Sequence, residues 1–133
     1  MKQILLLIFS CLLFGCSKSP DRNFIIEQLR KKNIDELVKY CDFPFNLNVD
    51  FEYSDPAIKN AKVLKQKLNA LCKKKYFEDF FHKNRIIKSD DNIILEVRSF
   101  NEDGELESES ALNFSFKKNA AGNWVLYGIL MAG

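Results

Sequence analysis

The stretch CDFPFNLNV, residues 41–49, decides how the rest of the chain is arranged. Within it and just beyond, apolar residues alternate with polar ones: Phe45, Leu47, Val49 and Phe51 against Asn46, Asn48, Asp50 and Glu52. A period of two is typical of a strand with one face buried and the other in solvent. Pro44 ends any helix that precedes it. We therefore predict a half-buried strand that follows directly on a helix.

Two helices are predicted before this strand. The first begins near Asp21, with Ser19 as its cap, and buries Ile25, Ile26 and Leu29. The second is short and begins at Asn33, which suits the N-cap position, while Glu36 occupies the capping-box position. It buries Leu37.

A longer helix is predicted after the strand, followed by a change of period. Its apolar stripe consists of Ala61, Leu64, Leu68, Leu71, Tyr76 and Phe80. Alternating strands then place inward Ile93, Leu95, Val97, Leu112, Phe114 and Phe116, and a last strand covers residues 124–131. Turns are expected at Asp103-Gly104 and at residues 119–123. Glu96 and Arg98 alternate with the apolar face and are expected in solvent. Helices followed by an antiparallel meander give an α+β fold with the helices on one face of the sheet.

This order of elements resembles the nuclear transport factor two superfamily, a group of cystatin-like folds. The resemblance rests on the short helix, CDFPFNLNV, the long helix and the closing GNWVLYGIL, and covers nearly all of residues 21–131. It implies a curved, cone-like sheet wrapped around the helices. Ketosteroid isomerases and many non-enzymatic binding proteins share that fold, so the resemblance does not fix a function.

The N-terminus carries a separate signal. Lys2 precedes an apolar run over residues 4–14, broken only by Ser10, and a bilayer-spanning helix needs about 20 residues. A short run of this kind is typical of a secretory signal peptide. Leu13-Phe14-Gly15-Cys16 resembles the lipobox of bacterial lipoproteins, which implies cleavage before Cys16 and lipid on its thiol. Ordinary secretion and a buried apolar segment are the alternatives.

Under this interpretation the chain has three parts: a signal peptide over residues 1–15, a lipidated tether over residues 16–20, and a single domain over residues 21–133. The tether is short, and at about 3.5 Å per residue it reaches roughly 15 Å, which holds the domain close to the membrane of the bacterial envelope. Ser17 is not the aspartate that retains lipoproteins in the inner membrane of enteric bacteria, so the family resemblance favours the outer membrane.

Cys41 and Cys72 are the cysteines left for the folded domain, because Cys11 leaves with the signal peptide and Cys16 carries lipid. Export permits a disulfide between them. Two buried free thiols that behave as small hydrophobic residues are the other alternative.

The sequence contains no recognisable motif for chemistry. Metal-ligand spacing, a glycine-rich phosphate loop and a nucleophile elbow are all missing, and the one histidine, His82, is expected at the surface near a helix end. We therefore predict no catalytic residue, no metal and no cofactor.

Two groups of residues are candidates for binding. The resemblance implies a cavity in the cone, which would be lined by Phe45, Leu47, Leu68, Phe80, Leu95, Phe114 and Trp124 unless these side chains simply fill the core. Charge is also uneven: residues 59–88 hold ten basic and two acidic side chains, whereas residues 90–109 hold eight acidic side chains and Arg98. Contact with an anionic surface is expected at Lys65, Lys67, Lys73 and Lys74, unless this is merely a solvated helix face.

These observations favour a membrane-anchored envelope lipoprotein that binds a protein partner or a small apolar ligand without catalysis. Nucleic acid is not an expected partner of an exported domain. One alternative is an isomerase- or dehydratase-like enzyme that uses the cone cavity. Another is an immunity or inhibitor lipoprotein directed against a toxin or hydrolase, because an acidic hairpin suits a basic target.

Overall fold

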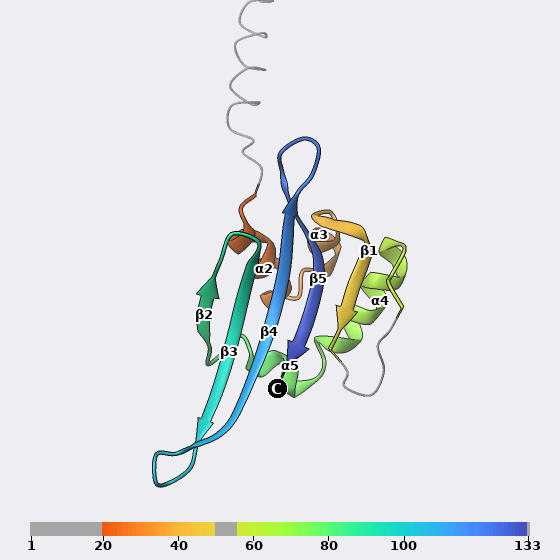
Figure 1. Cartoon of the computed structure of the whole chain (residues 1–133). Coiled ribbons are helices and arrows are strands. Elements are labelled where there is room, and N and C mark those ends of the chain that lie inside the picture. Colours follow the sequence, from red (N-terminus) through yellow and green to blue (C-terminus); the bar gives the residue numbers. More distant parts are fainter. Residues whose placement is uncertain (1–19, 50–55, 133) are drawn as a thin grey trace, which may run out of the picture.

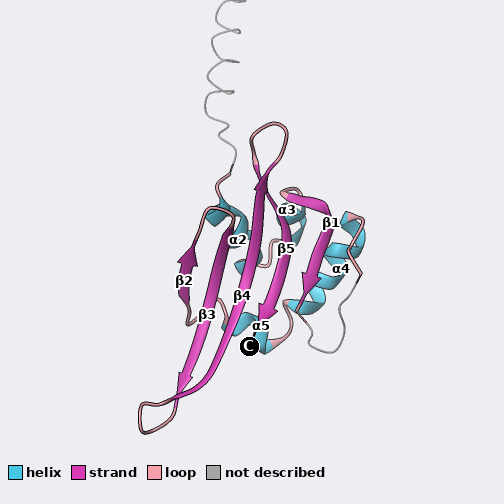
Figure 2. Cartoon of the chain, in the orientation of Figure 1, coloured by secondary structure: helices cyan, strands magenta, loops and turns pink. Residues whose placement is uncertain are grey.

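The computed structural model describes residues 20–49 and 56–132, so the predicted signal peptide, Cys16, Ser19 and the strand end at Phe51 lie outside the described residues. Figures 1 and 2 show the elements. The helices are α2 (Arg22–Arg30), α3 (Ile34–Val38), α4 (Ala61–Leu71) and α5 (Lys75–Asp79). The strands are β1 (Cys41–Asn48), β2 (Arg85–Lys88), β3 (Asn92–Phe100), β4 (Leu106–Lys118) and β5 (Trp124–Ala132).

The five strands form one sheet in the order β1-β5-β4-β3-β2, and the helices lie behind one of its faces (Figure 1). This arrangement confirms the predicted α+β class. Strands β3 to β5 form the expected antiparallel meander and β2 adds a further antiparallel strand at its edge, but β1 pairs with β5 in parallel, so the sheet is mixed. The helices and the other strands separate β1 from β5 in the chain, so no hairpin joins these two strands. A tight turn would require them to be antiparallel, and without one they can pair in parallel.

One row of cross-strand partners shows how the sheet is divided into two faces. Ile93 on β3 pairs with Phe114 on β4, Phe114 pairs with Ile129 on β5, and Ile129 pairs with Leu47 on β1. All of them are buried beneath the helices. The alternation predicted for residues 45–49, 93–97 and 112–116 is thus confirmed, since each predicted inward position of these strands belongs to the core or packs against it. The inner face of the sheet is its hydrophobic face.

Two features of the sheet differ from the sequence prediction. Glu96 points to the outer face, yet only 9% of it is exposed, because it lies on a central strand beside Arg98, whose Nε is 2.6 Å from the Glu96 carboxylate. The strand β2 was not predicted at all. Its four residues are all exposed at the sheet edge, and an edge strand without a buried face shows no alternation of apolar and polar residues.

The two N-terminal helices are confirmed, with different caps. Asp21, and not Ser19, is the N-cap of α2, and its side chain accepts a hydrogen bond from the Phe24 amide at 2.8 Å. Asn33 precedes α3 as predicted but makes no capping hydrogen bond; its side-chain amide donates to Gln28 instead. The Glu36 carboxylate accepts from Lys39 and Tyr40, so the predicted capping box does not form.

The predicted long helix is two helices. α4 ends at Leu71, and Lys74 adopts an extended backbone before α5 begins. This break rotates the apolar face, so that Phe77 is buried and Tyr76 is exposed, the reverse of the predicted stripe. Phe80 is buried as expected. None of the helices in the described ranges is long and apolar enough to span a membrane.

The hairpins β3–β4 and β4–β5 turn in the same way. In the first, the Asn101 side chain accepts hydrogen bonds from the amides of Asp103 and Glu105, and Gly104 has a φ of 79°. In the second, Asn119 accepts from the amides at positions 121 and 123, and Gly122 has a φ of 80°. A positive φ favours glycine, so both predicted turns are confirmed and both are ordered by an asparagine.

Gly128 allows β1 to lie against β5. It pairs with Asn46 on one side and Ser115 on the other, and a Cβ at this position would lie 3.3 Å from the Asn46 carbonyl oxygen. A side chain at position 128 therefore requires the Asn46 backbone to shift by a few tenths of an ångström.

We predict that Gly128→Val lowers the free energy of unfolding by about 1–3 kcal/mol, the usual cost of overpacking. Urea denaturation measures this effect. Ala132→Val is the matched control, because Ala132 is exposed on the same strand and a surface substitution changes stability by less than about 0.5 kcal/mol. Equal stability of the two variants would contradict the close packing of β1 on β5.

Candidate functional site

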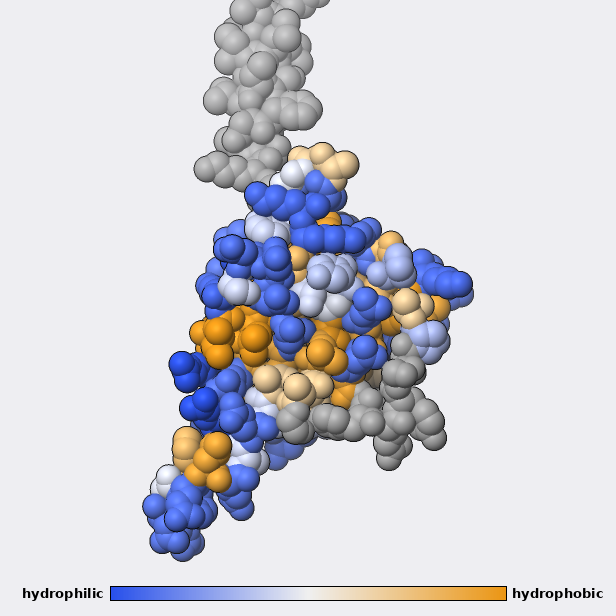
Figure 3. All heavy atoms as spheres, in the orientation of Figure 1, coloured by the Kyte–Doolittle hydropathy of each residue, from blue (hydrophilic) through white to orange (hydrophobic). Residues whose placement is uncertain are grey.

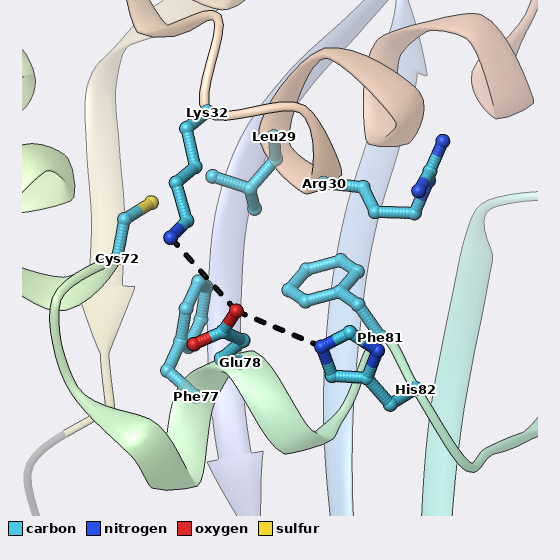
Figure 4. Close-up of a pocket in the computed structure, with 8 residues that line it drawn as sticks. All are labelled: Leu29, Arg30, Lys32, Cys72, Phe77, Glu78, Phe81 and His82. Atoms are coloured by element: carbon cyan, nitrogen blue, oxygen red, sulfur yellow. Dashed lines mark ion pairs between the residues drawn. The ribbon is translucent and has the colours of Figure 1, made fainter.

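A pocket of about 70 Å³ lies among the helices, at the end of α2 and beside α5. Figure 4 shows its lining, which consists of Leu29, Arg30, Lys32, Cys72, Phe77, Glu78, Phe81 and His82. No strand contributes to this lining. The pocket is therefore a feature of the helical layer and lies apart from the predicted interior of the cone.

The apolar side of the pocket is built from three residues on two segments. Leu29 comes from the last turn of α2, and Phe77 comes from α5. Phe81 follows α5 and packs edge-on against Phe77, with 5.5 Å between the ring centroids. Leu29 and Phe77 are almost wholly buried, so this side is a fixed part of the core.

The polar side of the pocket is a group of charged residues around Glu78. The Lys32 Nζ lies 3.9 Å from the Glu78 Oε1, and the His82 Nε2 lies 3.6 Å from the same oxygen (Figure 4). Both separations are longer than hydrogen bonds. Arg30 is engaged elsewhere, because its guanidinium donates to both carboxylate oxygens of Glu27, and this interaction lowers the pKa of Glu27.

Cys41 and Cys72 are both free thiols in the structure. The Cys41 thiol donates to the Leu37 carbonyl at 3.5 Å, and burial raises its pKa to about 12. Cys72 faces the pocket, where burial raises its pKa, Lys32 opposes that rise and Glu78 adds to it. Neither thiol is an activated nucleophile, since a reactive cysteine needs a lowered pKa.

The residues predicted to line a cone cavity are parts of the core. Phe45, Leu68 and Phe114 are 0% exposed, so no water-sized void touches them. Leu47, Phe80 and Leu95 are also buried in the same cluster. None of these side chains lines the pocket of Figure 4.

Trp124, the last residue predicted for the cavity, is half-buried at the start of β5. The Arg22 guanidinium and the Lys118 ammonium each lie 5.1 Å from its ring centroid. Arg22 also donates to the backbone carbonyls of Ser89 and Asp90. Trp124 therefore helps to fix the start of α2 against the sheet, through cation–π contacts.

The four lysines predicted to contact an anionic surface lie along α4 and just beyond it. Lys65 forms an ion pair with Asp35 at 3.3 Å, which ties α4 to α3. Lys74 lies over the Tyr76 ring at 5.8 Å. Lys67 is half-buried and Lys73 is exposed. Part of the basic stretch thus has a structural role within the helical layer.

The acidic stretch projects further from the domain than the basic stretch does. Figure 1 shows that the β3–β4 hairpin extends beyond the other strands. Its acidic side chains are Glu102, Asp103, Glu105, Glu107 and Glu109, and all are exposed. Phe100 and Leu106, which pair at the base of the turn, are 58% and 51% exposed. On the face seen in Figure 3 the tip of the hairpin is hydrophilic, and apolar residues lie between this tip and the body of the domain.

Comparison with known proteins identifies the architecture. No family model and no curated protein matches the chain. An NTF2-like protein of unknown function from Cytophaga hutchinsonii superimposes with a TM-score of 0.50 at 11% identity, over 81% of each chain. The described domain has an NTF2-like fold. This likeness confirms the predicted resemblance as a statement about the fold alone.

Other NTF2-like structures superimpose less closely. A ketosteroid isomerase-like protein from Erwinia carotovora atroseptica has a TM-score of 0.47 at 13% identity, over 80% of this chain and 85% of that one. ActVI-ORFA from Streptomyces coelicolor has a TM-score of 0.45 at 10% identity, over 83% and 89%. Function in this NTF2-like domain therefore has to be argued from its own side chains.

The pocket residues were not identified from the sequence. His82 is exposed just after α5, as predicted, and its place beside Glu78 follows from their i, i+4 spacing. Lys32 carries one local signal: α2 ends without a glycine, in the run LRKKN at residues 29–33. Among the described residues, no three histidine, cysteine or acidic side chains are close enough to hold a metal ion.

The free cysteines give a direct prediction. Residues 17–133, denatured without a reducing agent, should show two titratable thiols. In the folded domain at pH 9, Cys41 should react with iodoacetamide far more slowly than in the unfolded chain, because a pKa of about 12 leaves it almost fully protonated. Mass spectrometry of the alkylated peptides measures both results. A thiol count of zero would show that the disulfide forms after all.

Proposed function

We propose that this protein is a lipid-anchored lipoprotein of the bacterial envelope, with the outer membrane favoured over the inner one. Its domain binds a protein partner without catalysing a reaction. The observation that carries the proposal is the β3–β4 hairpin, an ordered acidic element that extends beyond the sheet. The lipid anchor is supported by the lipobox at residues 13–16.

The hairpin has the properties of a recognition element. Its tip is held by the Asn101 side chain and its backbone by the long pairing of β3 with β4, so it loses little conformational freedom on binding. Its charge is of one sign apart from Arg98, which bridges Glu96 and Glu109. A concentrated charge accelerates encounter with a partner of opposite sign.

Exposed apolar side chains accompany this charge. Five of the seven large apolar residues exposed in the described chain belong to the sheet: Ile86, Ile87, Phe100, Leu106 and Leu130. Protein interfaces combine such apolar contacts with a polar rim. An acidic hairpin with exposed apolar residues favours a partner with a basic protein surface. A toxin or hydrolase that the lipoprotein inhibits is the kind of partner that best fits these properties.

The enzymatic alternative has less support. General acid–base catalysis works best in a site that excludes water and fixes its groups. In the described pocket the side chains of Glu78 and His82 are 47% and 67% exposed. Glu96 is the buried carboxylate of the sheet, but it lies on the outer face beside Arg98 and outside the lining of the pocket.

Site-specific photo-crosslinking in intact cells tests the partner. A crosslinking residue at Leu106 should give one defined adduct, and the same residue at Asn69, exposed on α4, should not. Replacement of Glu102, Asp103, Glu105 and Glu107 by their amides should abolish the adduct, because the charge that attracts the partner is gone. The thermal stability of this variant should be unchanged or higher, since like charges no longer repel. An adduct that survives neutralisation would contradict the role of the hairpin.

The anchor is tested separately. Mass spectrometry of the protein from membranes should show an N-terminal peptide that begins at Cys16 and carries acyl chains, and Cys16→Ser should release the domain from the membrane. Two or more acyl chains are needed because each buried CH₂ contributes only about 0.8 kcal/mol. An intact Met1 or an unmodified Cys16 would show that the proposed anchor is wrong.

A further inference from the structure

Lys32 occupies a backbone position that glycine normally takes. Its φ is 61°, the one positive φ of a non-glycine residue among those described. The Lys32 amide donates to the Leu29 carbonyl at 2.9 Å, and the Asn33 amide donates to the Gln28 carbonyl at 2.8 Å. These bonds form the motif that ends many helices, in which the residue with positive φ is usually glycine. A lysine here destabilises the helix end relative to glycine.

The side chain of this lysine is directed into the pocket (Figure 4). There Lys32 and His82 approach the same oxygen of Glu78 from two sides, and neither makes a hydrogen bond to it. Both nitrogens are thus close enough to share one anion and remain available for shorter contacts. A carboxylate that binds between them can reach charge-assisted hydrogen bonds of about 2.8 Å.

The surroundings of the pocket favour an anion with an apolar body. The segment of residues 73–83, which includes α5, carries Lys73, Lys74, Lys75 and Lys83 against Glu78 and Asp79; of these six side chains, Glu78 lines the pocket. The opposite wall is the apolar group of Leu29, Phe77 and Phe81, with Cys72. At about 70 Å³ the pocket has room for a short chain or a single ring, and not for a larger body.

We propose that this pocket binds a small molecule with one anionic head on a short apolar body. The head lies between Lys32 and His82 and displaces the Glu78 carboxylate from them, while the body packs on Phe81, the partly exposed apolar side chain of the lining. This site is separate from the hairpin that carries the proposed function, because no residue of β3 or β4 lines it.

Titration with hexanoate, followed by NMR of the backbone amides of residues 17–133, tests this site. Saturable shifts should appear in residues 29–33 and 77–82. Lys32→Gly should weaken hexanoate binding by about fivefold or more and raise the melting temperature, because glycine relieves the positive φ. Glu78→Gln should strengthen binding, because it removes the competing carboxylate.

Three controls make the test decisive. Lys31→Ala removes an adjacent exposed cation that does not line the pocket, and it should leave binding unchanged. Hexylammonium has the same body with the opposite charge and should bind more weakly than hexanoate. Inorganic phosphate supplies an anion without a body and should also bind more weakly.

Several results would overturn the proposal. These are the absence of saturable shifts at millimolar hexanoate, equal binding by Lys32→Gly and the wild type, or tighter binding of hexylammonium or phosphate. Because Lys32→Gly improves the helix end, loss of binding in this variant cannot be attributed to unfolding. Loss of the crosslinked adduct at Leu106 would leave this result unaffected, so the two proposals fail independently.

Discussion

Burial of the inner face of the sheet beneath the helices is the constraint on which the rest of the structure depends. Phe45, Phe114 and Leu126 bring β1, β4 and β5 together without exposed surface, and each such side chain contributes about 1.5–3 kcal/mol when fully buried. This packing joins β1 to β5 in parallel and holds the helices in one layer. Aromatic and aliphatic side chains thus fill the space in which the cone would otherwise have a cavity.

Because these side chains are buried in the interior, we propose binding at the outside of the molecule. The sheet has a second face and a projecting hairpin, and the helical layer has a pocket of its own. These surfaces differ in charge, since the hairpin is acidic and the segment around the pocket is basic. The same NTF2-like framework presents two separate surfaces, and we propose that each binds a different kind of ligand. In the proposed site Lys32 binds the anion, but its positive φ makes lysine less favourable than glycine at the end of α2. The lysine that this site requires therefore reduces the stability of the helix end.

The strands were predictable from the sequence because one buried face imposes a strict period of two. The caps and the helix break were less predictable. Asp21 and Ser19 are equally good caps by composition, and the change from Tyr76 to Phe77 as the buried residue depends on a backbone break at Lys74 that no glycine or proline marks. Glu96 was misplaced because its burial comes from neighbouring strands, which a local pattern does not contain.

The candidate site was the least predictable part. Its residues come from the end of α2, the end of α4 and the segment around α5, so their meeting is a consequence of tertiary packing. The predicted cavity residues other than Trp124 are buried, but a sequence pattern does not distinguish the wall of a cavity from the middle of a core. That distinction depends on the sizes of side chains that meet from distant elements.

A crystal of the domain pressurised with xenon tests the central claim, that the interior between sheet and helices is filled. Xenon enters empty apolar cavities. We expect no xenon next to Phe45, Leu68 or Phe114, because these side chains are 0% exposed. Xenon bound at these residues would show an open cone, and would contradict the proposal that this domain binds its ligands at its outer surfaces.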